Sequence, residues 1–148
     1  MTWATARLDA IVAGTLDLPP VVTTLKLGLL DAWEPGLVRK HWTPDPAILN
    51  GDGTLFGGHI AALADQILAF AAMSVVPAES AFRTSNLQLQ FFKVGAARPL
   101  DIEARVIALT QRLISVEADF RRADGDLIAR ASAQQMILPM PGASGGAA

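Results

Sequence analysis

The sequence predicts an α+β fold in which one antiparallel sheet packs against one long helix. Three observations indicate this class: a long apolar run with helical spacing over residues 57–74, two short strand-like segments before it, and three or four longer alternating segments after it. Strands grouped in this way, without a helix between each pair, favour antiparallel pairing and a separate helical layer.

The segments before the long helix are separated by residues that end regular structure. We expect a helix over residues 2–13, a strand over 25–33 and a partner strand over 37–43. Pro19 and Pro20 end the first helix, and the Glu34-Pro35-Gly36 segment supplies the turn between the two strands. A glycine-rich loop over residues 50–54 then leads into the long helix.

The long helix has two different faces. Bulky side chains recur on one face, which we expect to pack against the sheet: Ile60, Leu63, Ile67 and Phe70. Small residues and one carboxylate share the other face: Gly58, Ala61, Ala62, Asp65, Ala69 and Ala72. Because a carboxylate is costly to bury among apolar groups unless something pairs with it, catalysis is one explanation for Asp65. The small side chains allow a ligand or a second backbone to approach closely.

The second half of the chain is predicted to be strands. They are expected over residues 84–93, 100–110, 114–122 and 127–138. The Asp124-Gly125 pair indicates a hairpin between the last two. Three regions follow: a helix and linker over 1–21, the domain over 22–138, and a disordered tail over 139–148. The sheet has edges to protect, so a dimer that extends the sheet is expected.

The composition limits the possible functions. A chain of 148 residues with 51% hydrophobic residues is one domain that can bury a core. The 12 Lys and Arg residues form no basic run and the formal net charge is −2, so no nucleic-acid partner is expected. The absence of cysteine excludes disulfides and thiol catalysis. Two histidines, His41 and His59, are too few for a His-rich zinc site, and no bound metal is expected.

The sequence predicts a cytoplasmic protein that does not bind a membrane. Its N-terminus lacks a basic start followed by an apolar core, which a secretory signal requires. The most apolar run, over residues 60–76, contains Asp65 and Gln66, and is too short and too polar for a membrane span.

The segment from Asn50 to Asp65 carries the most specific pattern, Asn-Gly-Asp-Gly-Thr-Leu-Phe-Gly-Gly-His-Ile-Ala-Ala-Leu-Ala-Asp. It resembles the motif of hotdog-fold acyl-CoA thioesterases, and the likeness covers residues 22–138. The phenylacetate-degradation branch has Asn, two residues, Gly, two residues, His-Gly-Gly, six residues, Asp. The bacterial acyl-CoA hydrolase branch has Phe in place of that His, as Phe56 is here. Residues 84–92 and the Asp-Gly hairpin are more similar to the first branch.

The resemblance implies a hotdog fold, with the sheet wrapped around the central helix, and it implies catalytic roles. By that likeness the Gly57 N–H polarises the thioester carbonyl, and Asp65 is the general base or the nucleophile. Asn50 lies near the attacking water or the carbonyl, and Thr84 helps to hold the water. Each residue also has a structural explanation: a tight helix entry for Gly57, a paired helix residue for Asp65, a turn for Asn50 and a strand start for Thr84.

Phe56 and Gly58 are expected to line the substrate site. If the first branch is the nearer relative, Phe56 removes a polar group beside the thioester, and the rate or the preferred acyl group changes. His59 is three positions away on the helix and does not replace that imidazole. Three basic residues near predicted strand ends are candidates for the phosphates of coenzyme A, with ordinary solvated charges as the alternative: Lys93, Arg98 and Arg112.

The expected function is hydrolysis of an acyl- or aryl-CoA to the free acid and coenzyme A. No cofactor is expected, because coenzyme A is part of the substrate. The resemblance implies a homodimer or homotetramer with each site at a subunit interface. Three alternatives remain: a non-catalytic acyl-CoA- or lipid-binding protein on the same fold, a hydratase or dehydratase, and a purely structural domain. A hydratase generally needs a His paired with an acid, and His59 is poorly placed for that.

Overall fold

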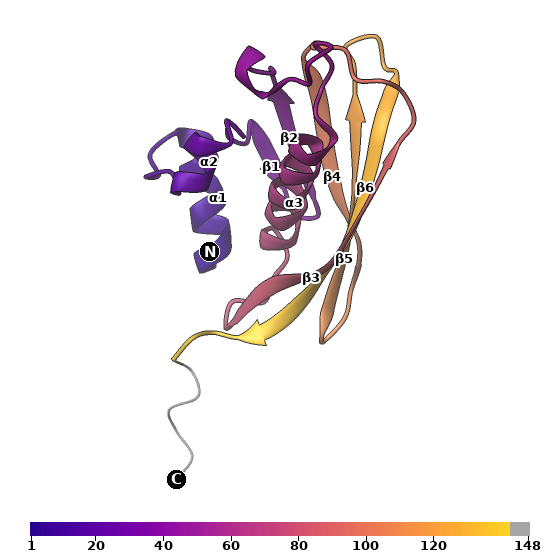
Figure 1. Cartoon of the computed structure of the whole chain (residues 1–148). Helices are drawn as coiled ribbons and strands as arrows, with labels where there is room; N and C mark the ends of the chain where they lie inside the picture. The colour runs from indigo at the N-terminus through magenta and orange to yellow at the C-terminus, as the bar shows by residue number, and fades with distance from the viewer. Residues whose placement is uncertain (143–148) are drawn as a thin grey trace.

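The computed structural model describes residues 1–142, and the fold is α+β as predicted (Figure 1). The helices are α1 (Trp3–Ala13), α2 (Pro20–Thr24) and α3 (Gly57–Met73), with a short 3-10 turn, η1 (Pro46–Ile48). The strands are β1 (Ala32–Glu34), β2 (Leu37–Trp42), β3 (Ser80–Phe91), β4 (Leu100–Leu109), β5 (Leu113–Arg121) and β6 (Leu127–Pro139).

The six strands form one sheet in the order β1-β2-β4-β5-β6-β3, and every neighbouring pair is antiparallel. Strand β3 immediately follows α3 in the chain yet lies at the far edge of the sheet, beside β6. Helix α3 contacts all strands from β2 to β6, while α1 and α2 lie on the side of α3 away from the sheet (Figure 1). The sheet therefore wraps around α3 and leaves β3 as a long edge strand.

The core lies between α3 and the inner face of the sheet. Ile60, Leu63 and Ile67 are at most 2% exposed and pack there, as their spacing predicts. Ala72 is fully buried in the same core, so the expectation that it lines an open groove is wrong. Phe70 is only half-buried and faces the N-terminal helices, because its position places it on the same side of α3 as Ala69 and Gln66.

The predicted strand over residues 25–33 is wrong except at its end, where β1 forms from Ala32 to Glu34. Pro20 instead begins α2, because proline at the first helical position has the φ angle that a helix needs. Lys26 and Gly28 then have positive φ angles of 51° and 69°, which a continuous strand does not allow.

The other predicted segments are confirmed, with shifted ends. The strand predicted to begin at Thr84 starts four residues earlier, at Ser80. The boundaries at residues 21 and 138 stay predictions, although Ala4, Leu8 and Ile11 of α1 belong to the main core. The predicted disordered tail falls largely on residues 143–148, which lie outside the described residues.

Candidate functional site

The loop before α3 is held in one shape by its own polar groups. Both N–H groups of the Asn50 amide donate within the loop, one to Thr54 Oγ1 at 2.9 Å and one to the Leu55 carbonyl at 3.1 Å. Leu55 N donates to the Gly95 carbonyl at 2.7 Å, which ties this loop to the β3–β4 connection. The amide of Asn50 thus shapes the entry to α3, as the structural explanation expects.

Helix α3 begins with a backbone N–H that is free to bind an acceptor. Within residues 1–142 the Gly57 N–H donates no hydrogen bond, whereas the N–H groups of His59 and Ile60 donate to the Phe56 carbonyl. A free N–H at the positive end of a helix is suited to a developing oxyanion. A Cβ at Gly57 would lie 3.1 Å from the Phe91 ring, so this helix start is also tightly packed against the end of β3.

Phe56 and Gly58 form a local pair. The Phe56 ring is 55% exposed and lies over Gly58, where a Cβ would come within 2.8 Å of the ring. Any larger residue at position 58 would displace Phe56. The pair therefore presents an apolar surface beside the Gly57 N–H, where the phenylacetate-degradation branch is expected to have an imidazole.

Asp65 is exposed in the single chain, on the small-residue face of α3 where a ligand or a second backbone can approach. Its Oδ1 accepts a hydrogen bond from Thr84 Oγ1 at 3.0 Å. Asp65 lies on the side of α3 that faces the N-terminal helices and β3, away from the packed core. This hydrogen bond brings two of the predicted site residues together.

A β-bulge brings Thr84 to Asp65. The register of β3 on β6 shifts between Thr84 and Asn86, so that Ser85 is inserted. Leu87 faces α3. In a regular strand Thr84, three positions earlier, would lie on the opposite, outer face of the sheet. The extra residue turns Thr84 back to the inner face. Sequence alternation alone does not predict this bulge.

Gln135 of β6 is a site residue that the sequence did not indicate. It is fully buried opposite Thr84, and its Oε1 lies 3.0 Å from Thr84 Oγ1. Within the described residues its Nε2 is buried without a partner. The Thr84 hydroxyl has one hydrogen and can donate to only one oxygen at a time. If the side-chain amide of Gln135 is rotated by 180°, its nitrogen donates to Thr84 Oγ1, and Thr84 donates to Asp65. The available sequence signal was the alternation of the last strand, which places Gln135 on the same face as Ala133 and Ile137.

Gly57 and Asp65 are too far apart to act on one carbonyl within a single chain. Eight residues along α3 separate them by about 12 Å of axial rise. They also border different cavities: one of about 450 Å³ is lined by Asn50, Gly57 and Lys93, while Asp65 lines two others. The helix therefore brings the two predicted catalytic groups to separate regions of the surface.

The three predicted phosphate-binding residues are also divided. Lys93 and Arg98 are exposed in the β3–β4 connection near the start of α3, and Lys93 pairs with Asp126 at 2.8 Å. Arg112 is exposed in the β4–β5 turn, at the opposite end of the sheet. In one chain these residues do not form a single basic patch.

The two histidines lie outside this arrangement. His59 is 7% exposed and stacks on Trp42 with ring centroids 5.3 Å apart, as a packed helix residue. Burial, and secondly the charge of Lys40, lower the pKa of His59. His41 is exposed on β2 and contacts Asp101 at 2.7 Å.

Lys40 is buried between β2 and α3, where its Nζ donates to Gln66 Oε1 at 2.5 Å. Burial lowers its pKa from 10.5 to about 7, and the Asp31 carboxylate partly opposes that shift. Between these two values the unfolded chain binds the proton and the folded chain does not. The contribution of Lys40 to the free energy of unfolding therefore increases as the pH rises from about 7 to about 10.

We expect the Lys40→Met variant to lose this pH dependence. Relative to the variant, the free energy of unfolding of the native protein should increase by up to about 1.4 kcal/mol per pH unit above pH 7. Urea unfolding at pH 7, 8 and 9 measures the difference, with Lys93→Met, an exposed lysine, as the control. Parallel pH profiles for native protein and Lys40→Met would contradict the assignment.

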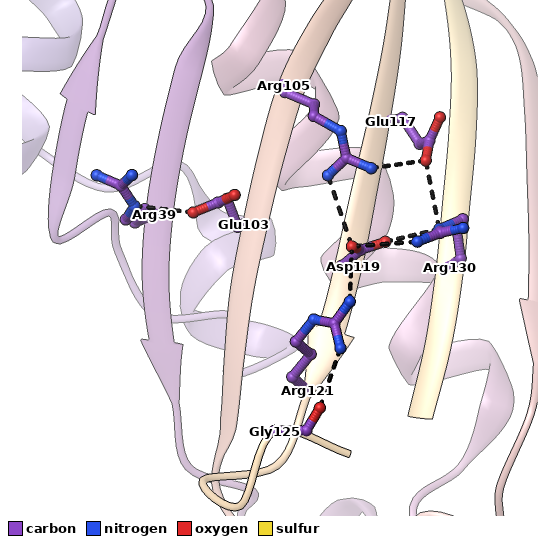
Figure 2. Close-up of polar contacts among 8 residues, drawn as sticks. All are labelled: Arg39, Glu103, Arg105, Glu117, Asp119, Arg121, Gly125 and Arg130. Carbon is purple, nitrogen blue, oxygen red and sulfur yellow. Dashed lines mark hydrogen bonds and ion pairs between the residues drawn. The ribbon is translucent and has the colours of Figure 1, made fainter. Parts of the chain in front are cut away.

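The outer face of the sheet carries a paired ion network (Figure 2). Asp119 on β5 contacts Arg130 at 2.7 Å, Arg121 at 3.3 Å and Arg105 at 3.6 Å. Burial raises the pKa of Asp119, but the hydrogen bond from Arg130 and the nearby guanidinium charges outweigh it and lower the pKa. The network ties β4, β5 and β6 together on the face that points away from α3.

Within residues 1–142 no group of three or more His, Asp or Glu side chains is placed to hold a metal ion. Over the same residues, no helix combines the length and apolar character of a membrane span.

The sequence matches the model of the thioesterase superfamily over residues 52–129, which is more than half of the chain. This chain belongs to the thioesterase superfamily. The match begins within the loop before α3 and extends into β6, so it includes Gly57, Asp65 and Thr84. No curated protein matches the chain.

Solved structures support the hotdog thioesterase fold of this superfamily member. A phenylacetic acid degradation-related protein of Ralstonia eutropha is 26% identical with a TM-score of 0.77, and the match covers 87% of this chain and 98% of that protein. A thioesterase family protein of Silicibacter pomeroyi is 25% identical with a TM-score of 0.76, and the match covers 89% of this chain and 98% of that protein. A Streptococcus mutans protein solved with acetyl-CoA is 21% identical with a TM-score of 0.68, and the match covers 74% of this chain and 87% of that protein.

Proposed function

We propose that two copies of this chain form an acyl-CoA thioesterase, in which Gly57 of one copy and Asp65 of the other act on the same thioester. The separation of these groups along α3 carries the proposal, because about 12 Å is too far for a base and an oxyanion donor to share one carbonyl. Superfamily membership supports thioester hydrolysis. The acetyl-CoA-bound structure from Streptococcus mutans supports a coenzyme A thioester as substrate.

Pairing between the β3 edge strands of two copies would form such a dimer. Strand β3 pairs only with β6 among the described strands and leaves Leu87 and Phe91 at least 36% exposed. Its Thr84 end lies beside Asp65, and its Phe91 end lies beside Gly57. Antiparallel pairing of two β3 strands centred on Gln88, with Ser85 bulged out as it is against β6, would place Thr84 of one copy opposite Phe91 of the other. Asp65 and Gly57 of different copies then lie side by side.

The same pairing unites the other predicted residues. The Arg112 end of one copy would lie beside the Lys93 and Arg98 end of the other, since β3 runs between these two ends of the sheet. Three cations then surround one entrance, where the phosphates of coenzyme A can bind. Phe56 and Gly58 form the apolar wall next to the thioester.

In this site the Gly57 N–H donates to the thioester oxygen and stabilises the negative charge that develops there. Asp65 removes a proton from a water, and the resulting hydroxide attacks the carbonyl carbon. The tetrahedral intermediate collapses, the carbon–sulfur bond breaks, and the proton held by Asp65 returns to the thiolate of coenzyme A, which leaves with the free acid as the other product. Alternatively, Asp65 attacks the carbonyl and forms an anhydride that water hydrolyses. Thr84 orients the carboxylate in either route.

Release of free thiol from acetyl-, octanoyl- and phenylacetyl-CoA tests the proposal. Turnover of at least one thioester is the expected result. Binding of these compounds without thiol release would instead support the non-catalytic acyl-CoA-binding alternative. If the protein neither binds nor hydrolyses these compounds, the proposed function and the acyl-CoA-binding alternative are both contradicted.

We expect Thr84→Val to lower kcat, because it removes the hydrogen bond to the Asp65 carboxylate. A hydrogen bond to a charged group corresponds to a loss of about ten- to a hundredfold. Thr84→Ser keeps the hydroxyl and should retain kcat within about twofold of the native value. Steady-state kinetics with the best substrate measures both variants. Equal kcat for Thr84→Val and the native protein would remove Thr84 from the site.

A further inference from the structure

An apolar cavity of about 310 Å³ opens beside Asp65, between α3 and the N-terminal segment. Helix α3 contributes Ala62, Asp65, Gln66, Ala69 and Phe70 to its wall. Most of the opposite wall comes from aliphatic residues before β1, among them Leu16, Leu18, Val21 and Leu25. Asp65 is thus at the border of a space that its neighbours make strongly apolar.

The N-terminal wall of the cavity is firmly attached to the domain. Ala4, Leu8 and Ile11 are at most 3% exposed and anchor α1 in the core. Trp3 Nε1 donates to the Ser80 carbonyl at 2.9 Å, which fastens α1 to β3. Trp33 Nε1 donates to Asp9 Oδ1 at the same distance, which fastens it to β1. These contacts fix α1, and Val22 and Leu27, at most 8% exposed, anchor the segment that follows it, so the wall can discriminate between ligands by shape.

This wall lies outside the region that matches the superfamily. The match begins at residue 52, whereas the residues of the N-terminal wall lie between positions 7 and 29. The part of the chain that carries Gly57 and Asp65 therefore lies within the superfamily match, and the cavity beside Asp65 is completed by residues outside that match.

We infer that this cavity receives the acyl group of the substrate, and that residues 7–29 select an uncharged medium-length alkyl or aryl group. The inference rests on the proposed function, because it assumes that the thioester lies at Asp65. A cavity of about 150 Å³ suffices for benzene, so about 310 Å³ holds an aryl group with a short linker or a medium-length chain.

The lining excludes a charged end on the acyl group. Apart from Asp65, the one ionisable side chain in the lining is Arg7, which is exposed and also borders the neighbouring cavity that contains Thr84. A charge in the aliphatic interior would have no partner. Each methylene that enters this interior should raise kcat/KM by about fourfold. Octanoyl-CoA is thus expected to be a much better substrate than acetyl-CoA.

Substitutions that fill the cavity test the inference. Val21→Trp adds bulk at a residue that lines the cavity and is 52% exposed, and Val12→Trp makes the same change on α1 at a valine that is 42% exposed and outside the lining. We expect Val21→Trp to lower kcat/KM for octanoyl- and phenylacetyl-CoA by at least about tenfold, with acetyl-CoA changed by less than about twofold. Val12→Trp should leave all three unchanged. Ala69→Leu fills the cavity from the opposite wall and should repeat the result of Val21→Trp.

The outcomes separate this inference from the proposed function. If the native protein hydrolyses no thioester, the proposed function fails. If the native protein is active and both filling variants change acetyl- and octanoyl-CoA hydrolysis by the same factor, the cavity does not hold the acyl group. A native preference for acetyl-CoA over octanoyl-CoA would also overturn the inference. Thermal melts of every variant confirm that the kinetic comparison is made on folded protein.

Discussion

Replacing Asp65 with asparagine is expected to lower kcat for acyl-CoA hydrolysis by about 10²- to 10⁴-fold, the range for losing a general base. The substitution preserves the size of the side chain and its ability to accept the hydrogen bond from Thr84. It removes the negative charge that both proposed routes require. The thiol-release assay with the best acyl-CoA measures the effect.

The exposed position of Asp65 makes this variant informative. Because the side chain does not pack in the core, Asp65→Asn should have the melting temperature of the native protein, and a loss of activity cannot be attributed to unfolding. Asp17→Asn is the matched control, since it removes the same charge from an exposed aspartate outside the cavity lining. Native-like kcat in Asp65→Asn would exclude Asp65 as base and as nucleophile.

Replacing Gly57 with proline is expected to lower kcat by about 10²- to 10³-fold, because proline removes the proposed oxyanion donor. The backbone should accept the substitution: Gly57 is the first residue of α3, and Phe56 has φ −72° and ψ 124°, which suit the residue before a proline. Gly57→Ala is the control, because it keeps the N–H and adds the same crowding against Phe91. Equal activity of the proline and alanine variants would exclude the N–H from catalysis.

The same two variants test whether the site spans two copies. A two-fold dimer with one Asp65→Asn subunit and one Gly57→Pro subunit has one site with both defects and one with neither. Differently tagged subunits allow this mixed dimer to be purified, and we expect it to recover about half of the native activity. If Gly57 and Asp65 of one chain acted together, the mixed dimer would be as inactive as either parent.

The sequence by itself was sufficient for the elements whose signals are local. The 3.6-residue spacing of apolar residues predicted α3, and the Asp124-Gly125 pair predicted the last hairpin, because these patterns reflect which backbone angles and faces are accessible. The strand over 25–33 was wrong for the same kind of reason. Its apolar residues resemble a strand, but Pro20 begins a helix and Lys26 interrupts extension.

The Asn50–Asp65 motif alone was sufficient to indicate the superfamily to which the chain belongs. The motif supplies both proposed catalytic groups, but it does not say which copies of the chain bring them to one thioester. In one helix the distance between two residues follows from their separation, so Gly57 and Asp65 stay about 12 Å apart. In the proposed dimer, which groups meet depends on how two β3 edge strands pair, and the sequence of the motif does not specify that pairing.

Only the tertiary structure determined the surroundings of Asp65. The bulge at Ser85 turns Thr84 toward it, and β6 brings the buried Gln135 behind Thr84 from 51 residues away. The N-terminal segment adds the apolar wall beside it. These contacts join parts of the chain that no short-range pattern connects, because they arise from packing the sheet and the N-terminal helices on opposite sides of α3. The local sequence therefore specified the chemistry that is available, and long-range packing decided where that chemistry is placed and what lies next to it.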